Sequence, residues 1–279
     1  MKVVVTGASG FLGQHIVAKL CDSQEPDLEV VGVSRQKVDG LIHVSDYRKT
    51  PSGDILIHLA EENSRAGANV GGANELARSL QTIEDLSKRS FSRIIYSSSA
   101  VLYGDKSTDA HKTSDVVEVN DDYSKMKLSG EQAIMANGHG MSVRLSNLYG
   151  QGMNPSNVVS TILRQAKIGE DVTVETLEPI RDFLWAEDAA TAILRIALND
   201  SFAKLPKILN IGTGVGSSIR EIAEIASRAS GWAKLNISAQ SIGAPSCIIL
   251  NIDETIEQLD WRPTVEIHTG IARLLHNEK

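Results

Sequence analysis

The sequence predicts an α/β fold: a doubly wound parallel sheet with a smaller, partly discontinuous C-terminal lobe. Short apolar runs alternate with helical patterns in the first half of the chain, and this alternation is lost in the second half. Strands that alternate with helices form parallel sheets covered on both faces. Such sheets bind ligands at the carboxyl ends of their strands, so the residues after each apolar run are the candidates for chemistry.

The apolar runs and the helical stripes give the expected elements in order. Strands are predicted at residues 3–5, 30–33, 55–59, 93–96 and 142–145. Helical spacing of apolar residues covers 11–20 and 76–86. A further helix is expected from about Asp122 to Asn137, where Gly138 and Gly140 stop it. The second half shows an isolated strand at 208–211 and helices at about 218–230 and 265–275.

Composition excludes several classes of protein. The 279 residues include 28 Lys and Arg against 35 Asp and Glu, a net charge of −7, which argues against nucleic acid as the main partner. Cys21 and Cys247 are too far apart for a disulfide framework, and no histidine or cysteine spacing predicts a metal site. Without a secretory leader or an apolar run of membrane length, we expect a cytoplasmic protein that does not enter a membrane.

A glycine loop follows the first strand. Gly7, Gly10 and Gly13 lie between that strand and the first helix, with Phe11 and Leu12 opening the helix. Glycine lets the backbone approach a ligand, and a helix start offers N–H groups and a positive dipole end. The loop therefore predicts a dinucleotide pyrophosphate site, and a tight turn without a ligand is the alternative.

The end of the second strand indicates which dinucleotide binds. An acid there would hold a ribose 2′-hydroxyl, but the sequence has Ser34 and Arg35. Both side chains suit a 2′-phosphate, so NADP is expected, with NAD possible. A solvated surface arginine is the alternative.

Three serines and a Tyr-Lys pair are the candidates for catalysis. Ser97 and Ser99 lie at the end of the fourth strand, and Tyr123 and Lys127 share one face of the following helix. A neighbouring ammonium favours a phenolate, and a tyrosine so placed can exchange a proton with an alcohol, beside a serine that holds the substrate oxygen. An exposed helical pair is the alternative.

Together these segments resemble an extended short-chain dehydrogenase/reductase of the NAD(P)-dependent epimerase/dehydratase family, which acts on nucleotide sugars. The segments that carry the resemblance are Thr6–Gly13, Asp54–Ala60, Tyr96–Gly104, Tyr123–Lys127, Arg144–Gly150, Arg181–Asp188, Asn210–Gly214 and Leu259–Pro263. The resemblance implies a Rossmann domain at 1–150 plus about 181–212. It places the substrate lobe at 151–180 and 213–279, and it implies a homodimer through the helices at about 64–88 and 122–137.

The resemblance also assigns roles to residues. The implied cofactor-binding set is Gly7, Gly10, Phe11, Leu12, Gly13, Ser34, Arg35, Asp46, Tyr47, Leu59, Ala60, Asn74, Ser97, Tyr123 and Lys127. Asp46 and Tyr47 match the adenine position, and Leu59 and Ala60 match the segment beside the ribose. Ser99 matches the catalytic serine, Tyr123 the general acid/base and Lys127 the ribose-holding lysine. Ser99, Asn147 and Arg181 match substrate-binding positions.

Two departures narrow the expected activity. Ala100-Val101 replaces the Asp-Glu pair of the family's dehydratases, which disfavours dehydration, and Gly243–Cys247 lacks a second phosphate-binding arginine. The first expectation is therefore reduction of a nucleotide-activated 4-keto sugar, because Arg35 favours NADPH. A UDP-hexose 4-epimerase with recycled NAD and a non-catalytic dinucleotide sensor are the alternatives. The sequence does not name the sugar or the nucleotide.

Overall fold

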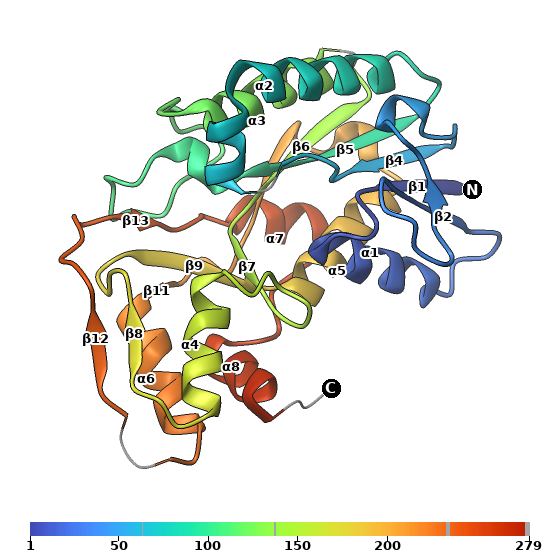
Figure 1. Cartoon of the computed structure of the whole chain (residues 1–279). Helices are drawn as coiled ribbons and strands as arrows, with labels where there is room; N and C mark the ends of the chain where they lie inside the picture. The colour runs from blue at the N-terminus through green and yellow to red at the C-terminus, as the bar shows by residue number, and fades with distance from the viewer. Residues whose placement is uncertain (63, 137, 233–234, 277–279) are drawn as a thin grey trace.

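A seven-stranded parallel sheet forms the centre of the larger lobe, which confirms the predicted fold class. The computed structural model describes residues 1–62, 64–136, 138–232 and 235–276. The strands of this sheet are β1 (Lys2–Thr6), β2 (Glu29–Ser34), β3 (Ile42–His43), β4 (Ile55–His58), β5 (Arg93–Ser99), β6 (Gly140–Leu145) and β10 (Ile208–Ile211). Their order is β10-β6-β5-β4-β1-β2-β3 (Figure 1). The carboxyl ends of β1, β4 and β5 therefore meet at one edge.

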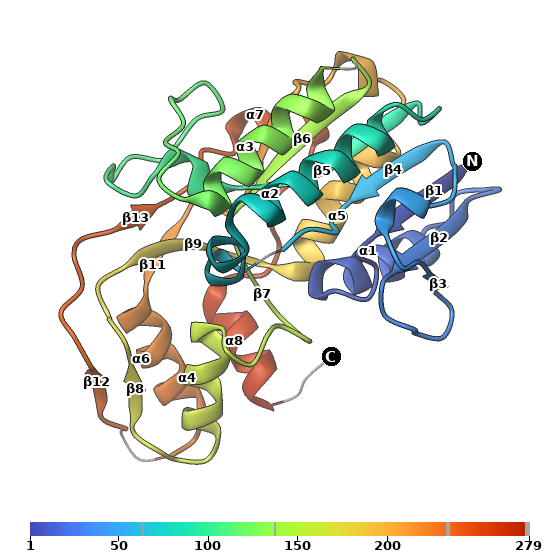
Figure 2. The ribbon, with the colours of Figure 1, turned by 45° about the horizontal axis from the view of Figure 1, so that its top comes forward.

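Helices cover both faces of the sheet. They are α1 (Phe11–Cys21) and α5 (Ala186–Ala197) on one face and α2 (Arg65–Ser87) and α3 (Asp122–Met135) on the other (Figure 2). Side chains alternate along a strand, so Val3 and Val5 pack toward α1 and α5, whereas Val4 packs toward α2 and α3. All three valines are fully buried, as a doubly covered sheet requires.

The smaller lobe is built around short strands and three amphipathic helices. Its strands are β7 (Asn147–Tyr149), β8 (Val172–Val174), β9 (Ile180–Trp185), β11 (Gly216–Ser218), β12 (Ile237–Ala239) and β13 (Cys247–Ile248). Its helices are α4 (Val158–Lys167), α6 (Ile219–Ala229) and α8 (Ile267–His276). β9 pairs with β7, β11 and β13, and β8 pairs with β12. A separate apolar core fills this lobe.

Several elements differ in detail from the expectations. The strand at 208–211 is not isolated, because β10 joins the edge of the large sheet beside β6. β9 pairs within the smaller sheet, whereas α5 packs on the large one, so the segment 181–212 contributes to both. The helix α3 ends at Met135, and the expected end at Asn137 lies outside the described residues. Gly140 already begins β6.

The remaining elements are short. They are α7 (Asp253–Leu259) and the 3₁₀ helices η1 (Tyr47–Lys49), η2 (Ala100–Tyr103) and η3 (Phe202–Lys204). None of the helices in the described part of the chain combines the length and apolar character needed to cross a membrane.

Candidate active site

The loop between β1 and α1 is rich in glycine, so backbone atoms without side chains lie at the start of the helix. Gly7 has a φ of +73°, and a Cβ at Gly13 would lie 2.2 Å from the Gly7 carbonyl oxygen. Gly10 is the N-cap of α1, and no side chain caps this helix or places an acid in its first turn. The first N–H groups of a helix have no partner within it and carry its positive dipole end. The loop therefore fits a pyrophosphate.

One cleft joins this loop to the candidate catalytic residues. The predicted site residues that line it are Gly7, Gly10, Phe11, Leu12, Gly13, Leu59, Ser97, Ser99, Tyr123 and Lys127. Ser98, the middle serine of the predicted cluster, also lines it, and so do three residues that sequence reasoning did not single out, Leu145, Ser146 and Leu148. The Oγ atoms of Ser98 and Ser146 are buried and have no hydrogen-bond partner in the described part of the chain. They leave polar capacity for a ligand at this cleft.

A second pocket is lined by Ala60, the residue after Leu59, together with Arg35, Asp46 and Tyr47. The Arg35 guanidinium carbon lies 5.3 Å from the centroid of the Tyr47 ring. The Asp46 carboxylate accepts from the side chain of Arg48, with its Oδ2 at 2.6 Å from Nη2 and 2.9 Å from Nε. These hydrogen bonds to Arg48 lower the pKa of Asp46. A cation stacked on a ring beside an acid offers a place for an adenosine end.

Two predicted cofactor residues lie apart from both pockets. Ser34 is fully buried, where its Oγ lies 2.7 Å from Ser9 Oγ and accepts from the backbone N of Gln36 at 2.9 Å. Asn74 is exposed on α2, and its neighbour Glu75 lines the second pocket instead. Their roles toward a cofactor stay predictions.

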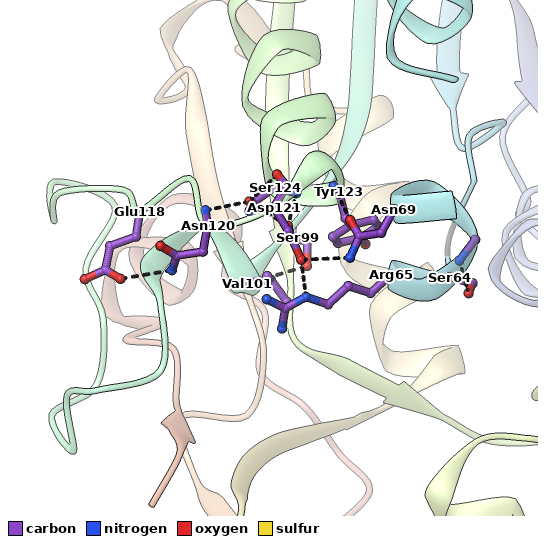
Figure 3. Close-up of polar contacts among 11 residues, drawn as sticks. Ser64, Arg65, Asn69, Ser99, Val101, Glu118, Asn120, Asp121, Tyr123 and Ser124 are labelled. Atoms are coloured by element: carbon purple, nitrogen blue, oxygen red, sulfur yellow. Dashed lines mark hydrogen bonds and ion pairs between the residues drawn. The ribbon is translucent and has the colours of Figure 1, made fainter. Parts of the chain in front are cut away.

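Ser99 is the last residue of β5 and the N-cap of η2. Its Oγ accepts from the backbone N of Val101 at 3.3 Å (Figure 3). A hydroxyl that accepts in this way keeps its own O–H for another acceptor. Ser99 can therefore donate a hydrogen bond to an oxygen bound in the cleft.

Tyr123 is fixed by the start of α3. Its backbone N donates to Asn69 Oδ1 at 3.1 Å, and Asp121 and Ser124 form a capping box around it. Figure 3 shows Arg65 and Asn69 reaching from α2 to the Asp121 carboxylate. Burial alone would raise the pKa of Asp121, but hydrogen bonds from Ser124, Arg65 and Asn69 lower it to about 2. The turn that carries Tyr123 is thus tied to a neighbouring helix.

Lys127 lies one turn further along α3. Its Nζ lies 5.8 Å from the centroid of the Tyr123 ring, donates to Ser97 O at 2.9 Å, and donates to Glu61 Oε2 at 2.8 Å. Burial alone would lower the pKa of Lys127, but the Glu61 carboxylate outweighs it and the pKa is raised. Sequence reasoning missed Glu61, although an acid just after the strand ending at His58 is a signal that could have found it.

Two of the three predicted substrate-binding residues, Asn147 and Arg181, lie on the smaller lobe. Arg181 on β9 donates to the backbone oxygens of Ile180 and Ser246 and, at 2.6 Å, to Ser246 Oγ. Burial lowers the pKa of this guanidinium, and its hydrogen-bond partners are all neutral. Asn147 is exposed at the start of β7. In the described part of the chain, no carboxylate accepts a hydrogen bond from Arg181.

No group of His, Cys, Asp or Glu suited to a metal ion occurs among the described residues. His58 at the end of β4 is buried, and its Nδ1 lies 2.8 Å from Thr6 Oγ1. Burial lowers the pKa of His58 to about 4, so the imidazole is neutral at pH 7. Its contacts are those of a packed histidine.

Comparisons with known proteins identify the family and the fold. Residues 3–212 match the family described as NAD dependent epimerase/dehydratase. A putative UDP-glucose 4-epimerase of Methanocaldococcus jannaschii is 25% identical over 98% of this chain and 97% of its own length. A dTDP-4-dehydro-6-deoxyglucose reductase of Escherichia coli is 24% identical over 98% and 96%. Among solved structures, the UDP-glucose 4-epimerase of Thermotoga maritima with UDP-glucose is 22% identical, with a TM-score of 0.85 over 99% of this chain and 98% of its own.

Proposed function

Because the chain belongs to the NAD dependent epimerase/dehydratase family, whose enzymes act on nucleotide sugars, we propose that it reduces a nucleotide-activated 4-keto sugar with NADPH. The observation that supports this most is the single cleft lined by the glycine loop, Ser99, Tyr123 and Lys127. A hydroxyl, a phenol and an ammonium beside a phosphate-binding loop are the groups that hydride transfer to a ketone requires.

The residues present fit a dinucleotide. The glycine loop and the uncapped start of α1 would hold its pyrophosphate. The Lys127 ammonium has three N–H donors, of which Glu61 and Ser97 take two, so one is available for the nicotinamide ribose. Arg35 and Tyr47 would flank the adenosine end.

Reduction of a ketone needs a hydride at carbon and a proton at oxygen. The reduced nicotinamide supplies the hydride when bound. Ser99 Oγ–H donates a hydrogen bond to the carbonyl oxygen, and Tyr123 transfers its phenolic proton to that oxygen as the C=O bond becomes C–O. The Lys127 ammonium stabilises the phenolate that this leaves, and solvent returns the proton.

The cleft is poorly equipped to eliminate water. None of its described lining residues carries a carboxyl group. Ala100 and Val101, which begin η2 directly after Ser99, supply no acid either. Elimination of water needs a proton donor for the departing hydroxyl. Dehydration is therefore not expected as the main reaction.

A 4-epimerase with recycled NAD is the second candidate, and the similarity to the Methanocaldococcus jannaschii protein favours it. The same three side chains would act, with Tyr123 first removing a hydroxyl proton and later returning it. NADPH consumption with 4-keto-6-deoxy sugars linked to UDP, dTDP, GDP or CDP supports reduction. Interconversion of UDP-hexoses without added reductant would instead identify an epimerase. Tight dinucleotide binding without turnover of any panel member would indicate a sensor.

The choice of NADPH depends on Arg35. Its side chain is exposed beside the second pocket and forms no ion pair with any carboxylate in the described part of the chain. We expect Arg35→Ala to raise the KM for NADPH by about 10- to 100-fold and to leave the KM for NADH nearly unchanged, because a charge-assisted phosphate contact contributes about 1.5–3 kcal/mol. Lys37→Ala, two residues on and also exposed, is the matched control. An unchanged NADPH:NADH ratio would count against the assignment.

A homodimer remains part of the proposal. α2 and α3 lie side by side on the outer face of the large sheet (Figure 2). The exposed Ala77 lies on α2 at this face. We expect twice the chain mass by light scattering and a monomer for Ala77→Arg. A wild-type monomer at micromolar concentration would contradict this arrangement.

A further inference from the structure

Lys127 and Glu61 form an ion pair closed off from solvent. Their side chains keep only 6% and 2% of their surface exposed. The Glu61 carboxylate also accepts from Tyr96 Oη at 2.5 Å and from Ser79 Oγ. Donors from α3, β5 and α2 thus surround one carboxylate that lies between the two pockets. Burial alone would raise the pKa of Glu61, but Lys127, His58 and these hydrogen bonds outweigh it and lower the pKa.

Few other charges act on this pair. The ionisable groups around it are His58 on β4, Tyr96 on β5, Tyr123 and Glu131 on α3, and Glu75 and Arg78 on α2. His58 is neutral well above pH 4, and burial and Glu61 raise the pKa of Tyr96. Glu131 is paired with Arg144 at 2.8 Å, and Glu75 with Arg78 at 2.5 Å. Glu61 is therefore the main counter-charge to Lys127.

This counter-charge has a consequence for Tyr123. An ammonium 5.8 Å from the phenol ring favours the phenolate when it is unpaired. A carboxylate at 2.8 Å from that ammonium offsets a large part of its charge when viewed from the phenol, and the remainder still favours the phenolate. A reductase needs the protonated phenol as its proton donor, so it gains from such an offset.

We propose that Glu61 is a positioning residue for the reduction: it holds the Lys127 ammonium in the cleft and offsets its charge, so that Tyr123 keeps its proton until the substrate takes it. The benefit to catalysis rests on the proposed reductase function. The effect on Tyr123 ionisation does not, because it follows from the contacts of the free protein.

The test is a pH titration of the protein labelled with [¹³Cζ]tyrosine, followed by NMR. The chain has five tyrosines, and the Tyr123 signal is assigned by its loss in Tyr123→Phe. Glu61→Gln keeps the shape and an acceptor for Lys127 but removes the charge. We expect the midpoint of Tyr123 phenolate formation to move to lower pH by about one unit. Glu62→Gln is the matched control, because among the described residues the Glu62 side chain accepts only from the backbone N of Ser64.

The outcomes separate an electrostatic role from a structural one. If Glu61 only stabilises the fold, Glu61→Gln will have a lower free energy of unfolding and an unchanged Tyr123 midpoint. That result would overturn the proposal. An equal shift in Glu62→Gln would also overturn it. If Glu61→Gln does not fold, Glu61→Ala with Tyr96→Phe removes the acceptor and one donor together, and the same expectation applies.

This titration needs no substrate. A shifted midpoint without turnover of any keto sugar would refute the reductase and leave the Glu61 inference standing. Turnover of a keto sugar with an unshifted Tyr123 midpoint would refute the Glu61 inference and leave the reductase standing.

Discussion

Replacement of Tyr123 by phenylalanine isolates the chemistry of one oxygen atom. The ring is 9% exposed, and its hydroxyl has no hydrogen-bond partner among the described residues. Removing this oxygen breaks no internal hydrogen bond, so the free energy of unfolding should change by less than about 1 kcal/mol. The dinucleotide affinity should stay the same, because the glycine loop is untouched. Loss of the general acid should lower kcat by about 10²–10⁴-fold, or about 3–5 kcal/mol of barrier.

The assay compares kcat for the best substrate of the panel with dinucleotide affinity and urea unfolding on the same preparations. Tyr149→Phe is the matched control, since the buried Tyr149 hydroxyl likewise has no hydrogen-bond partner in the described part of the chain but belongs to the core of the smaller lobe. We expect near-normal kcat in that variant. Retention of more than a tenth of kcat by Tyr123→Phe, or an equal loss in both variants, would refute the assigned role.

Two further predictions concern the loop and the cap. Gly13→Ala would place a Cβ 2.2 Å from the Gly7 carbonyl oxygen, so the loop must open. The dinucleotide affinity, measured by calorimetry, should then fall about tenfold. An unchanged affinity would contradict the close approach of the two backbone segments. The pKa of Asp121 falls from 3.8 to about 2 on folding, so the stability it contributes is present above pH 4 and is lost as the pH falls through 2. Asp121→Asn should therefore be less stable by about 1 kcal/mol at pH 7 in urea unfolding, with a difference that shrinks toward pH 2. A difference independent of pH would contradict this cause.

The larger lobe could be predicted because its strands are continuous apolar runs. The runs at 3–5, 30–33, 55–59, 93–96 and 142–145 correspond to β1, β2, β4, β5 and β6. Their carboxyl ends carry the glycine loop, Leu59 and the three serines, so the rule for parallel sheets brought these residues to one edge. A single sequence was sufficient for these five strands, but it did not indicate β3 or the pairing of β10 with β6.

The smaller lobe could not be predicted as strands, because its pairing depends on distant polar partners. In β9, Asp182 is 1% exposed, and its carboxylate accepts from the backbone N of Thr213 at 2.8 Å and of Leu250 at 3.3 Å. An aspartate breaks the apolar run that marks a buried strand. Its acceptor role becomes visible only when chain segments 31 and 68 residues away are in place.

Helix phase limited the prediction of the site on α2. Gly72 has φ 52° and ψ −137°, which interrupts the helix, so the residues before and after it do not share one continuous face. Glu75 and Ser79 turn toward the second pocket, whereas Asn74 is exposed. Because the backbone changes direction at Gly72, the apolar spacing of the helix does not predict that Glu75 rather than Asn74 lines the pocket.

The uncapped start of α1 has a consequence for the lifetime of the protein. With Gly10 as its N-cap, the helix forgoes about a few tenths of a kcal/mol relative to a side-chain cap, and a bound phosphate would supply a partner for those N–H groups. A ligand at a hundredfold excess over its Kd adds about 2.7 kcal/mol to the folded state. Starvation for dinucleotide would therefore expose the empty enzyme to proteases first, and its abundance in a cell would follow the supply of its own cofactor.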